Sequence, residues 1–411
     1  MMIIILGSTA ILLPNQIHSH VHISIIIVNY NVKHYIEQCL HSVFTSITHA
    51  ALEAEIFIVD NASSDQSVEY LHTRFPQQEY PHLHIIANAR NVGFSRANNQ
   101  AVALATGKYI LFLNPDTLIT EDTLRECFHF AEQQTDFGAL GVKMLSDSGH
   151  FAMESRRGLP TPWVSFCKMS GMTALFPKSR TFARYYMSFL DRQQSAKIEI
   201  ISGAFMMVSQ KALQQCGSFD ETFFMYGEDI DLSYRFIKGG FKNYYLPTPI
   251  LHYKGESTQK NSYRYVHVFY EAMLIFFRKH YENLSPFFTI PIKCAIIVRA
   301  FIALIQQQLT NLFPQKDTEL YFGFIGTKEG FKQIKPITDK WMLNIEHISE
   351  EKVTDLDALK ISSHIKHLVF DPKLYTTKEM LLLMEQSNHK RYLSVFSPTT
   401  GILVTGGEVF D

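Results

Sequence analysis

The first third of the sequence alternates short apolar runs that end in polar residues with segments of helical spacing. The apolar runs are rich in β-branched and aromatic residues and predict buried parallel strands at residues 22–31, 54–65, 82–88 and 108–117. The segments between them predict helices at residues 35–47, 67–75 and 95–106, and we expect Gly107 to end the last one. This alternation restricts the chain to a doubly wound α/β fold with a mostly parallel, Rossmann-like sheet.

Polar side chains follow three of these predicted strands at the point where each strand ends. They are Asn29, the pair Asp60–Asn61, and Asn114 with Asp116. Ligands of doubly wound sheets bind beyond the carboxyl ends of the strands. We therefore expect these side chains to line a ligand site at one edge of the sheet.

The composition suits a globular protein of two domains. The chain has 411 residues, which is enough for two cores, and its net charge is −1. A nucleic-acid-binding protein usually carries a basic footprint, so no nucleic acid is expected as a partner. The five cysteines are scattered and form no Cys-x-x-Cys pair, which favours reduced thiols over disulfides or a zinc site.

Two stretches fall outside the strand–helix pattern. Residues 1–21 are apolar and then His-rich, and a degenerate leader, an extra strand or a start assigned too far upstream would each explain them. We favour the last, and treat these residues as an extension outside any domain. Residues 283–316 are amphiphilic, with Lys293 and Arg299 inside the apolar run. They predict a helical linker that lies at a membrane interface or packs on its own domain, rather than a membrane span.

The remaining segments continue the first sheet and then start a smaller one. Residues 201–209 and 243–253 predict strands, and residues 228–240 predict a helix stopped by two glycines. Further on, predicted strands at 319–326, 341–348, 366–371 and 391–396 accompany predicted helices at 355–365 and 377–387. We therefore expect one domain at residues 22–282 and a small Rossmann-like α/β domain at residues 317–411.

Three carboxylates, Glu228, Asp229 and Asp231, occupy four positions in a stretch that is otherwise aromatic. Burying negative charge in such surroundings is costly, so the arrangement needs a reason. A structural reason is that the acids follow Gly227 over the first turn of a helix, where the dipole favours negative charge. A catalytic reason is that one acid is a general base with a tuned pKa. This stretch alone leaves both open.

Seven motifs in a fixed order carry a family resemblance. They read SIIIVNYN, VDNASSDQS, NVGFSRANN, LFLNPDT, GAFMMV, FDETFFMYGEDIDLSYR and LHYKGES. From about Ser24 to Ser257 the chain resembles the family 2 glycosyltransferases, and most closely their rhamnosyltransferase-like branch. The resemblance implies a GT-A fold and an inverting transfer of a sugar from a nucleotide-sugar donor.

The resemblance also implies where the donor binds. In this family the ends of the first two strands hold the base and ribose of the nucleotide, since a carboxylate accepts hydrogen bonds from ring N–H and hydroxyl groups. In this sequence the corresponding donor-binding residues are Asn29, Tyr30, Asp60, Asn61 and Ser63, with Asn91, Gly93, Phe94 and Asn98 lining the floor of the pocket.

A divalent cation, Mg²⁺ or Mn²⁺, is implied as the cofactor. The segment Asn114-Pro115-Asp116 stands where the family often has Asp-x-Asp, so Asp116 would bind the ion that bridges the donor diphosphate. His252 matches a late histidine that can complete the metal shell. The sequence departs from the Asp-x-Asp pattern at Asn114, whose amide can form a hydrogen bond to the sugar or ribose but carries no charge.

The family assigns catalysis to the acidic motif. Asp229 corresponds to the catalytic base, Glu228 is the rival base or orients the acceptor, and Asp231 is expected to cap the helix. Arg156, Arg157 and Trp163 lie in the segment expected to shape the acceptor side, but a basic pair on a loop is an equally good interpretation of the two arginines.

The expected function is metal-dependent transfer of L-rhamnose from dTDP-L-rhamnose to a polyprenyl-diphosphate-linked saccharide, in the synthesis of a cell-surface polysaccharide. The enzyme would be cytoplasmic and peripheral to the inner face of the plasma membrane. The alternatives are a UDP-hexose or UDP-N-acetylhexosamine donor, or a catalytically silent scaffold that binds nucleotide sugar. A processive synthase would need several membrane spans and a Gln-x-x-Arg-Trp motif, and the sequence has neither. The tail is loosely similar to Rossmann-like regulatory segments of polysaccharide-assembly enzymes, which assigns it no activity.

Overall fold

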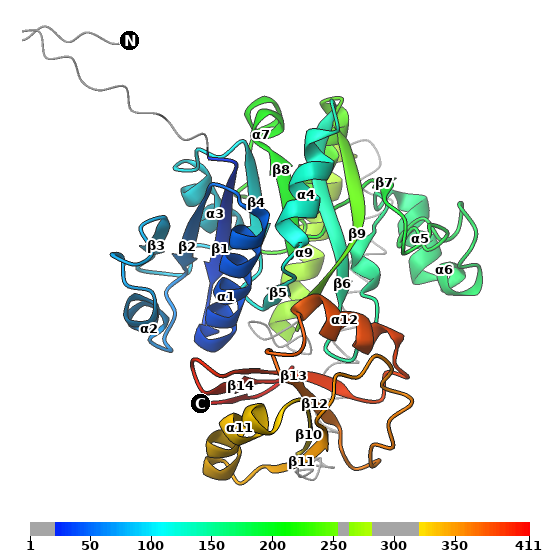
Figure 1. Ribbon diagram of the computed structural model, residues 1–411. Coiled ribbons are helices and arrows are strands. Elements are labelled where there is room, and N and C mark those ends of the chain that lie inside the picture. The colour runs from blue at the N-terminus through cyan, green and yellow to red at the C-terminus, as the bar shows by residue number, and fades with distance from the viewer. Residues whose placement is uncertain (1–20, 254–262, 282–319) are drawn as a thin grey trace, which may run out of the picture.

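A computed structural model of the chain describes residues 21–253, 263–281 and 320–411 (Figure 1). The predicted linker at 283–316 and all but the last residue of the predicted extension at 1–21 lie outside the described residues. The described residues form two sheets, one in the N-terminal unit (residues 21–253 and 263–281) and one in the C-terminal unit (residues 320–411). The α/β fold class with a mostly parallel central sheet is confirmed.

The first sheet has nine strands in the order β3-β2-β1-β4-β8-β6-β9-β5, with β7 paired to β9. Six strands run in one direction, while β5, β7 and β8 run in the other. The four strands predicted from the first third of the sequence are all present. The bounds are β1 Ile23–Asn29, β2 Ala54–Asp60, β3 Leu83–Ala87, β4 Tyr109–Leu113, β5 Thr117–Ile119, β6 Phe137–Leu145, β7 Ala196–Ile198, β8 Phe205–Ser209 and β9 Lys242–His252.

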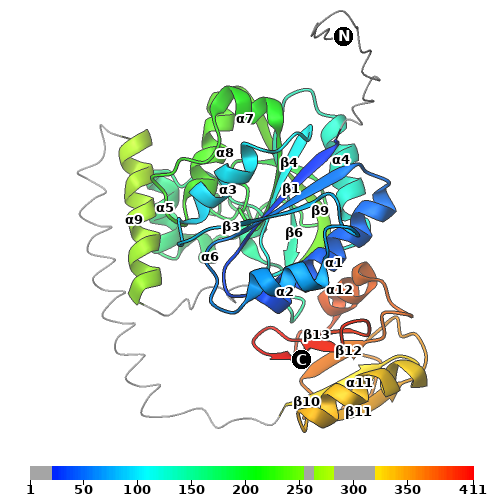
Figure 2. The same ribbon diagram turned by 90° about the vertical axis from the view of Figure 1, so that its left-hand side faces the viewer.

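Helices cover both faces of this sheet, because alternate residues of each strand point to opposite sides. Ile23, Ile25 and Ile27 of β1 pack in one core with α1, α2 and α4, and Ile26 and Val28 pack in another with α3, α7 and α8. Figures 1 and 2 show these two layers. The bounds are α1 Lys33–Ala50, α2 Ser67–Arg74, α3 Phe94–Val102, α4 Thr123–Glu132, α7 Gln210–Cys216 and α8 Glu228–Lys238.

The prediction that Gly107 ends the third helix is wrong, because α3 already ends at Val102. Gly107 instead lies against β1, where its N–H donates to Ser24 Oγ at 2.8 Å. A Cβ at this position would lie 2.5 Å from the backbone nitrogen of Ser24. The glycine is therefore required by a close approach of two backbone segments rather than by a helix end.

A long connection between β6 and β8 carries short elements at the edge of the N-terminal unit. It comprises the 3₁₀ turn η1 Met153–Ser155, α5 Pro162–Met169, α6 Met172–Leu175 and then β7. A further helix, α9 Tyr263–His280, packs against α8 through Ala272 and Phe276. In the part of the chain that the structure describes, no helix is long and apolar enough to cross a membrane.

The C-terminal unit is a six-stranded sheet in the order β11-β10-β12-β13-β14-β15, whose first four strands are parallel. The four strands and the second helix predicted for the tail are present. The predicted helix at 355–365 is wrong, because this segment forms turns, with Asp355 accepting a bond from Asp357 N at 2.9 Å. The bounds are β10 Tyr321–Ile325, α11 Lys328–Lys340, β11 Asn344–Ser349, β12 His367–Phe370, α12 Thr377–Gln386, β13 Tyr392–Ser397, β14 Ile402–Val404 and β15 Val409–Phe410.

The two units share a core at the end of the first sheet where β1, β2 and β9 end (Figures 1 and 2). Tyr35 and Tyr253 of the N-terminal unit belong to the same buried cluster as Met380 and Met384 of α12. The Tyr35 hydroxyl donates to Thr405 O at 3.0 Å, and Tyr35 packs edge-on against Tyr253 with ring centroids 5.3 Å apart. The C-terminal unit therefore reaches the residue that follows His252.

Candidate active site

The ends of β1 and β2 form a hydrogen-bonded polar cluster. Asn29 pairs with Asp60 in register, and its amide donates to Asp60 Oδ1 at 2.8 Å. The other Asp60 oxygen accepts from Ser63 N at 2.9 Å, and the Asn29 amide also lies 3.2 Å from Ser63 Oγ. Asn29 and Asp60 are buried, whereas Tyr30 is exposed. The structure thus brings together four residues of the predicted donor site, with Tyr30 at the open side.

The predicted floor of the donor pocket is tied to this cluster through Asn61. The Asn61 amide donates to Asn91 Oδ1 at 2.9 Å, and that oxygen also accepts from Gly93 N at 3.0 Å. Gly93 has a φ of 89°, and a Cβ on it would lie 2.7 Å from Phe224 O. Only glycine fits there, because the loop before α3 passes directly over the segment that leads to α8.

Phe94 and Asn98 hold this floor in place. Phe94 N donates to Phe224 O at 2.7 Å, which joins the start of α3 to the loop before α8. Asn98 is buried, and its amide donates to Phe94 O at 2.9 Å within the same helix. The contact of Asn98 that the structure shows is therefore internal to α3.

Asp116 and His252 meet across the pairing of β5 with β9. Asp116 Oδ1 lies 3.4 Å from His252 Nε2, and both side chains are largely buried. The other ring nitrogen, Nδ1, is buried and has no hydrogen-bond partner among the described residues. No group of three or more His, Cys, Asp and Glu residues is arranged to hold a metal in the part of the chain that the structure describes. A carboxylate oxygen beside an imidazole nitrogen fits a divalent cation as a partial shell.

Asn114 links this pair to the acidic motif through the backbone. Asn114 N donates to Ala204 O at 3.0 Å, and Asn114 O accepts from Thr117 Oγ1 at 2.8 Å. The neighbouring Gly203 N donates to Asp229 Oδ2 at 3.1 Å. The turn that carries Asp116 and the helix that carries Asp229 are therefore held by the same short segment.

Glu228 and Asp229 are the first two residues of α8, as the structural interpretation predicted. Gly227 precedes them with a φ of 81°, and both acids are buried. Asp229 Oδ2 accepts from Gly203 N and forms an ion pair with the Arg157 guanidinium, and Oδ1 accepts from Ile230 N at 2.8 Å. Three donors thus fix the position of the Asp229 carboxylate.

Glu228 lies in a different environment from Asp229. Burial, and next the negative charge of Asp229, raise the pKa of Glu228 to about 8. Glu228 Oε2 is buried and has no hydrogen-bond partner among the described residues. A buried carboxyl group with a raised pKa, next to a second buried carboxyl group, is an arrangement found where acids take part in proton transfer.

Arg157 belongs to the site, although the sequence left its role open between the acceptor side and a loop. Its guanidinium donates to Ile201 O at 3.0 Å as well as to Asp229. Arg156 lies elsewhere: it is buried over the rings of Phe151 and Tyr245 and donates to Leu190 O at 2.6 Å. A doublet of arginines gives no signal for which one faces the site.

The prediction that Asp231 caps α8 is wrong. No side chain caps this helix, and Asp231 is fully buried within a cluster of cations. Its oxygens lie 2.7 Å from Arg235 Nε, 2.9 Å from Lys279 Nζ and 2.7 Å from His280 Nε2. These partners hold the pKa of Asp231 below its usual range despite burial. Asp231 therefore fixes α9 against α8.

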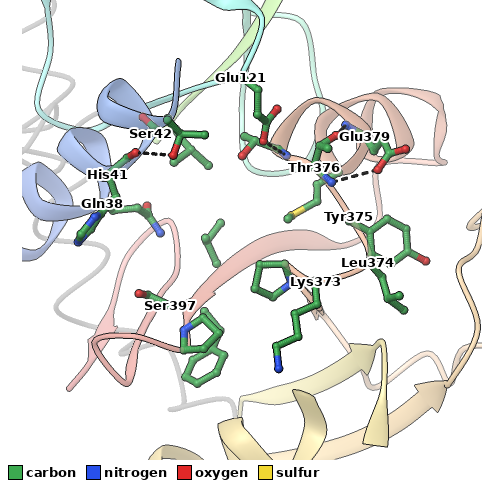
Figure 3. Close-up of a pocket in the computed structure, with 18 of the residues that line it drawn as sticks. Gln38, His41, Ser42, Glu121, Lys373, Leu374, Tyr375, Thr376, Glu379 and Ser397 are labelled. Carbon is green, nitrogen blue, oxygen red and sulfur yellow. Dashed lines mark hydrogen bonds between the residues drawn. The ribbon is translucent and has the colours of Figure 1, made fainter. Parts of the chain in front are cut away.

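A separate pocket of about 460 Å³ lies between the two units (Figure 3). Gln38 and His41 of α1 face Leu374, Tyr375 and Ser397 of the C-terminal unit across it. None of the predicted site residues lines this pocket. One lining residue contacts the neighbour of His252: Gln38 Oε1 accepts from the hydroxyl of Tyr253 at 2.9 Å.

Comparisons with known sequences find similar glycosyltransferases. Residues 24–217 match the sequence model of the family described as glycosyl transferase family 2. The chain is 27% identical over 218 residues to the low-salt glycan biosynthesis hexosyltransferase Agl10 of Haloferax volcanii, covering 52% of this chain and 61% of the relative. It is 25% identical over 240 residues to the N-acetylglucosaminyl-diphospho-decaprenol L-rhamnosyltransferase of Mycobacterium tuberculosis, covering 54% of this chain and 73% of the relative.

Among solved structures, the mannosyltransferase PcManGT from Pyrobaculum calidifontis, in complex with GDP-Man and Mn²⁺, shares 15% identity. The match covers 72% of this chain and 77% of that one, with a TM-score of 0.45. A likeness this weak says nothing about ligands.

Proposed function

We propose that this chain transfers a sugar from a nucleotide-sugar donor to a saccharide acceptor during the synthesis of a cell-surface glycan, since residues 24–217 match the model of glycosyl transferase family 2. The donor would be dTDP-L-rhamnose and the acceptor a polyprenyl-diphosphate-linked saccharide at the inner face of the plasma membrane. The mycobacterial relative is named as a rhamnosyltransferase acting on a decaprenyl-diphosphate-linked sugar, which supports this choice. A UDP-hexose or UDP-N-acetylhexosamine donor is the alternative.

One observation carries the proposal: three sets of polar side chains from distant parts of the sequence follow the carboxyl ends of strands in the same sheet or lie beside the segment that bonds them. Asn29 and Asp60 are hydrogen-bonded, Asp116 lies beside His252, and Asp229 is held by Gly203, next to the residue that bonds Asn114. In the proposed reaction these groups would serve as a donor-binding carboxylate, a partial metal shell and a base, at the point where doubly wound sheets bind ligands. A silent scaffold would need only the first of these.

The proposed reaction is a single displacement. The acceptor hydroxyl oxygen attacks the anomeric carbon, a C–O bond forms there, and the bond to the donor diphosphate breaks with its electron pair leaving on the phosphate. Asp229 takes the hydroxyl proton. Attack opposite the leaving group inverts the configuration of the sugar.

Arg157 and Glu228 would tune this base. The Arg157 guanidinium would orient the Asp229 carboxylate before the acceptor arrives. Glu228, protonated at neutral pH, can donate a hydrogen bond to an acceptor oxygen without adding a second negative charge. Glu228 remains the rival base, since a pKa of about 8 lies near the pH at which transfer occurs.

Asp116 and His252 would hold Mg²⁺ or Mn²⁺, with the donor phosphates completing the shell. When bound, the ion supplies positive charge that stabilises the departing diphosphate. The ion must therefore bind tightly only when donor is present, because two protein side chains make a weak site on their own.

The proposal is tested by thermal-shift measurements on the full chain with dTDP-rhamnose and with UDP-, GDP- and CMP-sugars, each with Mn²⁺ or EDTA. A ligand that binds only the folded state raises its melting temperature. We expect one nucleotide sugar to raise it in Mn²⁺ and much less in EDTA. A shift with a UDP-sugar instead would overturn the choice of donor, and equal shifts in Mn²⁺ and EDTA would overturn the metal site. No shift with any nucleotide sugar would overturn the proposed function.

A further inference from the structure

Large apolar side chains are exposed together on α5 and α6. Of the eleven exposed large hydrophobic residues in the described part of the chain, five lie within fourteen positions of this connection: Trp163, Phe166, Met169, Leu175 and Phe176. Their exposed fractions range from 49% for Trp163 to 73% for Leu175. We call these five residues the α5–α6 patch.

The aromatic members of the patch form one surface rather than scattered positions. The Trp163 and Phe166 rings are stacked with centroids 5.8 Å apart. Phe182 lies 6.3 Å from Trp163 and 5.4 Å from Phe176, so it connects the two helices. Contiguous exposed apolar surface on a soluble domain marks a place where another apolar phase or partner binds.

Along the sequence, the segment that carries the patch has charge of one sign, although Arg184 pairs with Glu199 from outside it. Residues 155–190 contain no Asp or Glu and carry six cations, although the whole chain has a net charge of −1. Arg156 and Arg157 are directed inward, whereas Lys178 and Arg180 are exposed directly beside Phe176. The six cations are Arg156, Arg157, Lys168, Lys178, Arg180 and Arg184.

A bilayer with anionic headgroups matches this combination better than a folded protein partner. Trp and Phe settle at the boundary between headgroups and acyl chains, while Lys and Arg extend toward the phosphates. In Figure 1, α5 and α6 project from the side of the N-terminal unit, away from the C-terminal unit, so a flat surface can reach them. α5 is held in place by its Thr161 cap and a proline at its start rather than by the patch itself.

We propose that the α5–α6 patch inserts into the surface of an anionic membrane and holds the acceptor side of the site against it. The inference rests on the proposed function, because a lipid-linked acceptor presents its saccharide at such a surface. The same connection carries Arg157, which contacts Asp229, and Leu159, which packs beside α9. Trp163 of the patch is therefore only six residues along the chain from Arg157, which contacts the proposed base.

The test uses the fact that the chain has two tryptophans. In Trp341→Phe, the emission of Trp163 reports on the patch alone. In Trp163→Phe, the emission of Trp341 reports on an exposed position of the C-terminal unit and serves as the control. Each protein is mixed with vesicles of phosphatidylcholine alone, or of phosphatidylcholine with phosphatidylglycerol, at low and high salt.

We expect the anionic vesicles to shift the emission of Trp163 to shorter wavelength, to make it accessible to brominated lipid, and to lose this effect at high salt. The emission of Trp341 should not change. The triple variant Phe166→Gln, Leu175→Gln, Phe176→Gln should bind the vesicles at least about tenfold more weakly, because three apolar side chains no longer enter the bilayer. Met342→Gln, which alters an exposed apolar residue of the other unit, should bind normally.

An unchanged Trp163 emission, or undiminished vesicle binding by the triple variant, would overturn the proposal. So would self-association of the native chain that the triple variant abolishes without lipid, since the patch would then be a contact between copies. No nucleotide sugar enters this experiment, so its result is independent of the thermal-shift test. The triple variant should keep the melting temperature and the donor-induced shift of the native chain, which shows that its site is intact.

Discussion

The two sheets of this molecule place a carboxylate at the same point of their topology and use it differently. In the N-terminal unit β1 lies between β2 and β4, and Asp116 follows β4; in the C-terminal unit β10 lies between β11 and β12, and Asp371 follows β12. Asp371 Oδ2 accepts from Thr327 N at 3.0 Å and from Thr327 Oγ1 at 2.6 Å, which closes the loop after β10. Asp116 instead reaches His252 on another strand.

The space around the two aspartates differs as well. A Cβ on Gly330, at the start of α11, would lie 2.5 Å from Asp371 Oδ2, so no ligand fits between the helix and the carboxylate. The backbone of the C-terminal unit has filled the crevice in which ligands of such sheets bind. A carboxylate at a strand end therefore indicates a ligand site only where the neighbouring loops do not use it themselves.

The largest difference that we expect between a variant of the N-terminal unit and one of the C-terminal unit is in the rate of transfer. Asp229→Asn should lower the rate of transfer at least about a hundredfold, because a carboxamide cannot take the acceptor proton. Asp371→Asn should leave the rate unchanged. Both are measured as initial rates with the donor that gives a thermal shift. Native turnover by Asp229→Asn would show that the base is another group, with Glu228 the first to test.

The two aspartates should also differ in their effect on donor affinity, by a smaller factor than the difference in turnover. Asp116→Asn should weaken donor binding at least about tenfold in Mn²⁺, because it removes about 1.5 kcal/mol or more of charge-assisted contact. In EDTA the variant and the native chain should bind donor alike. Asp371→Asn should bind donor normally but melt at a lower temperature, since it loses an acceptor for a buried bond worth about 1–3 kcal/mol. Weakened donor binding by Asp371→Asn would mean that a change in the C-terminal sheet alters the donor site of the N-terminal sheet.

Much of this organisation could be predicted from the sequence. The alternation of apolar runs and helical segments specified the parallel strands, and the polar residues at their ends specified Asp60 and Asp116 as neighbours of a site. These signals are local or follow from a general rule of sheet topology. The acids of α8 were located, but the raised pKa of Glu228 was not, because it depends on burial in the folded chain. The ion pair of Asp229 with Arg157 was not located either, because Arg157 approaches from a distant loop.

The failures have a common physical cause. Gly107, Asp231 and residues 355–365 were each interpreted from local propensity, as a helix end, a cap and a helix. Each is determined instead by a tertiary contact: Gly107 by its close approach to Ser24, Asp231 by its cations on α9, and residues 355–365 by turns that bury Leu356 and Ile365. The α5–α6 patch was missed for the same reason, since only the fold shows which apolar residues stay exposed.

The two units should also differ in how pH affects stability. Glu228 has a folded pKa of about 8, well above its usual 4.5. Between these values the unfolded chain releases a proton that the folded chain keeps, so stability falls as the pH rises toward 8. Glu228→Gln should remove this loss and raise the melting temperature at pH 8 by several degrees, about a few kcal/mol, with no gain at pH 4.5.

His367 predicts the opposite trend for the C-terminal unit. Burial lowers the pKa of His367 from 6.5 to about 4. As the pH falls from 6.5 to 4, His367 binds a proton in the unfolded chain but not in the folded chain, so the free energy of unfolding falls toward acid pH. His367→Gln should remove part of this acid loss and change nothing at pH 8. Melting curves of the two variants across this range would contradict the assignment if both showed the same trend.

The smallest expected effect concerns the contact between the units. Lys378 on α12 lies 2.9 Å from Asp122 Oδ2 and 2.8 Å from Glu126 Oε1 of the N-terminal unit. Because these groups are only partly buried, Lys378→Ala should cost about 1 kcal/mol or less, and high salt should reduce the difference. Lys352→Ala, which breaks a more exposed pair with Glu379 inside the C-terminal unit, is the matched control and should cost less. If Lys378→Ala also weakened donor binding, the C-terminal unit would stabilise the site through the shared core of Tyr35 and Tyr253. It would then do more than contact the N-terminal unit.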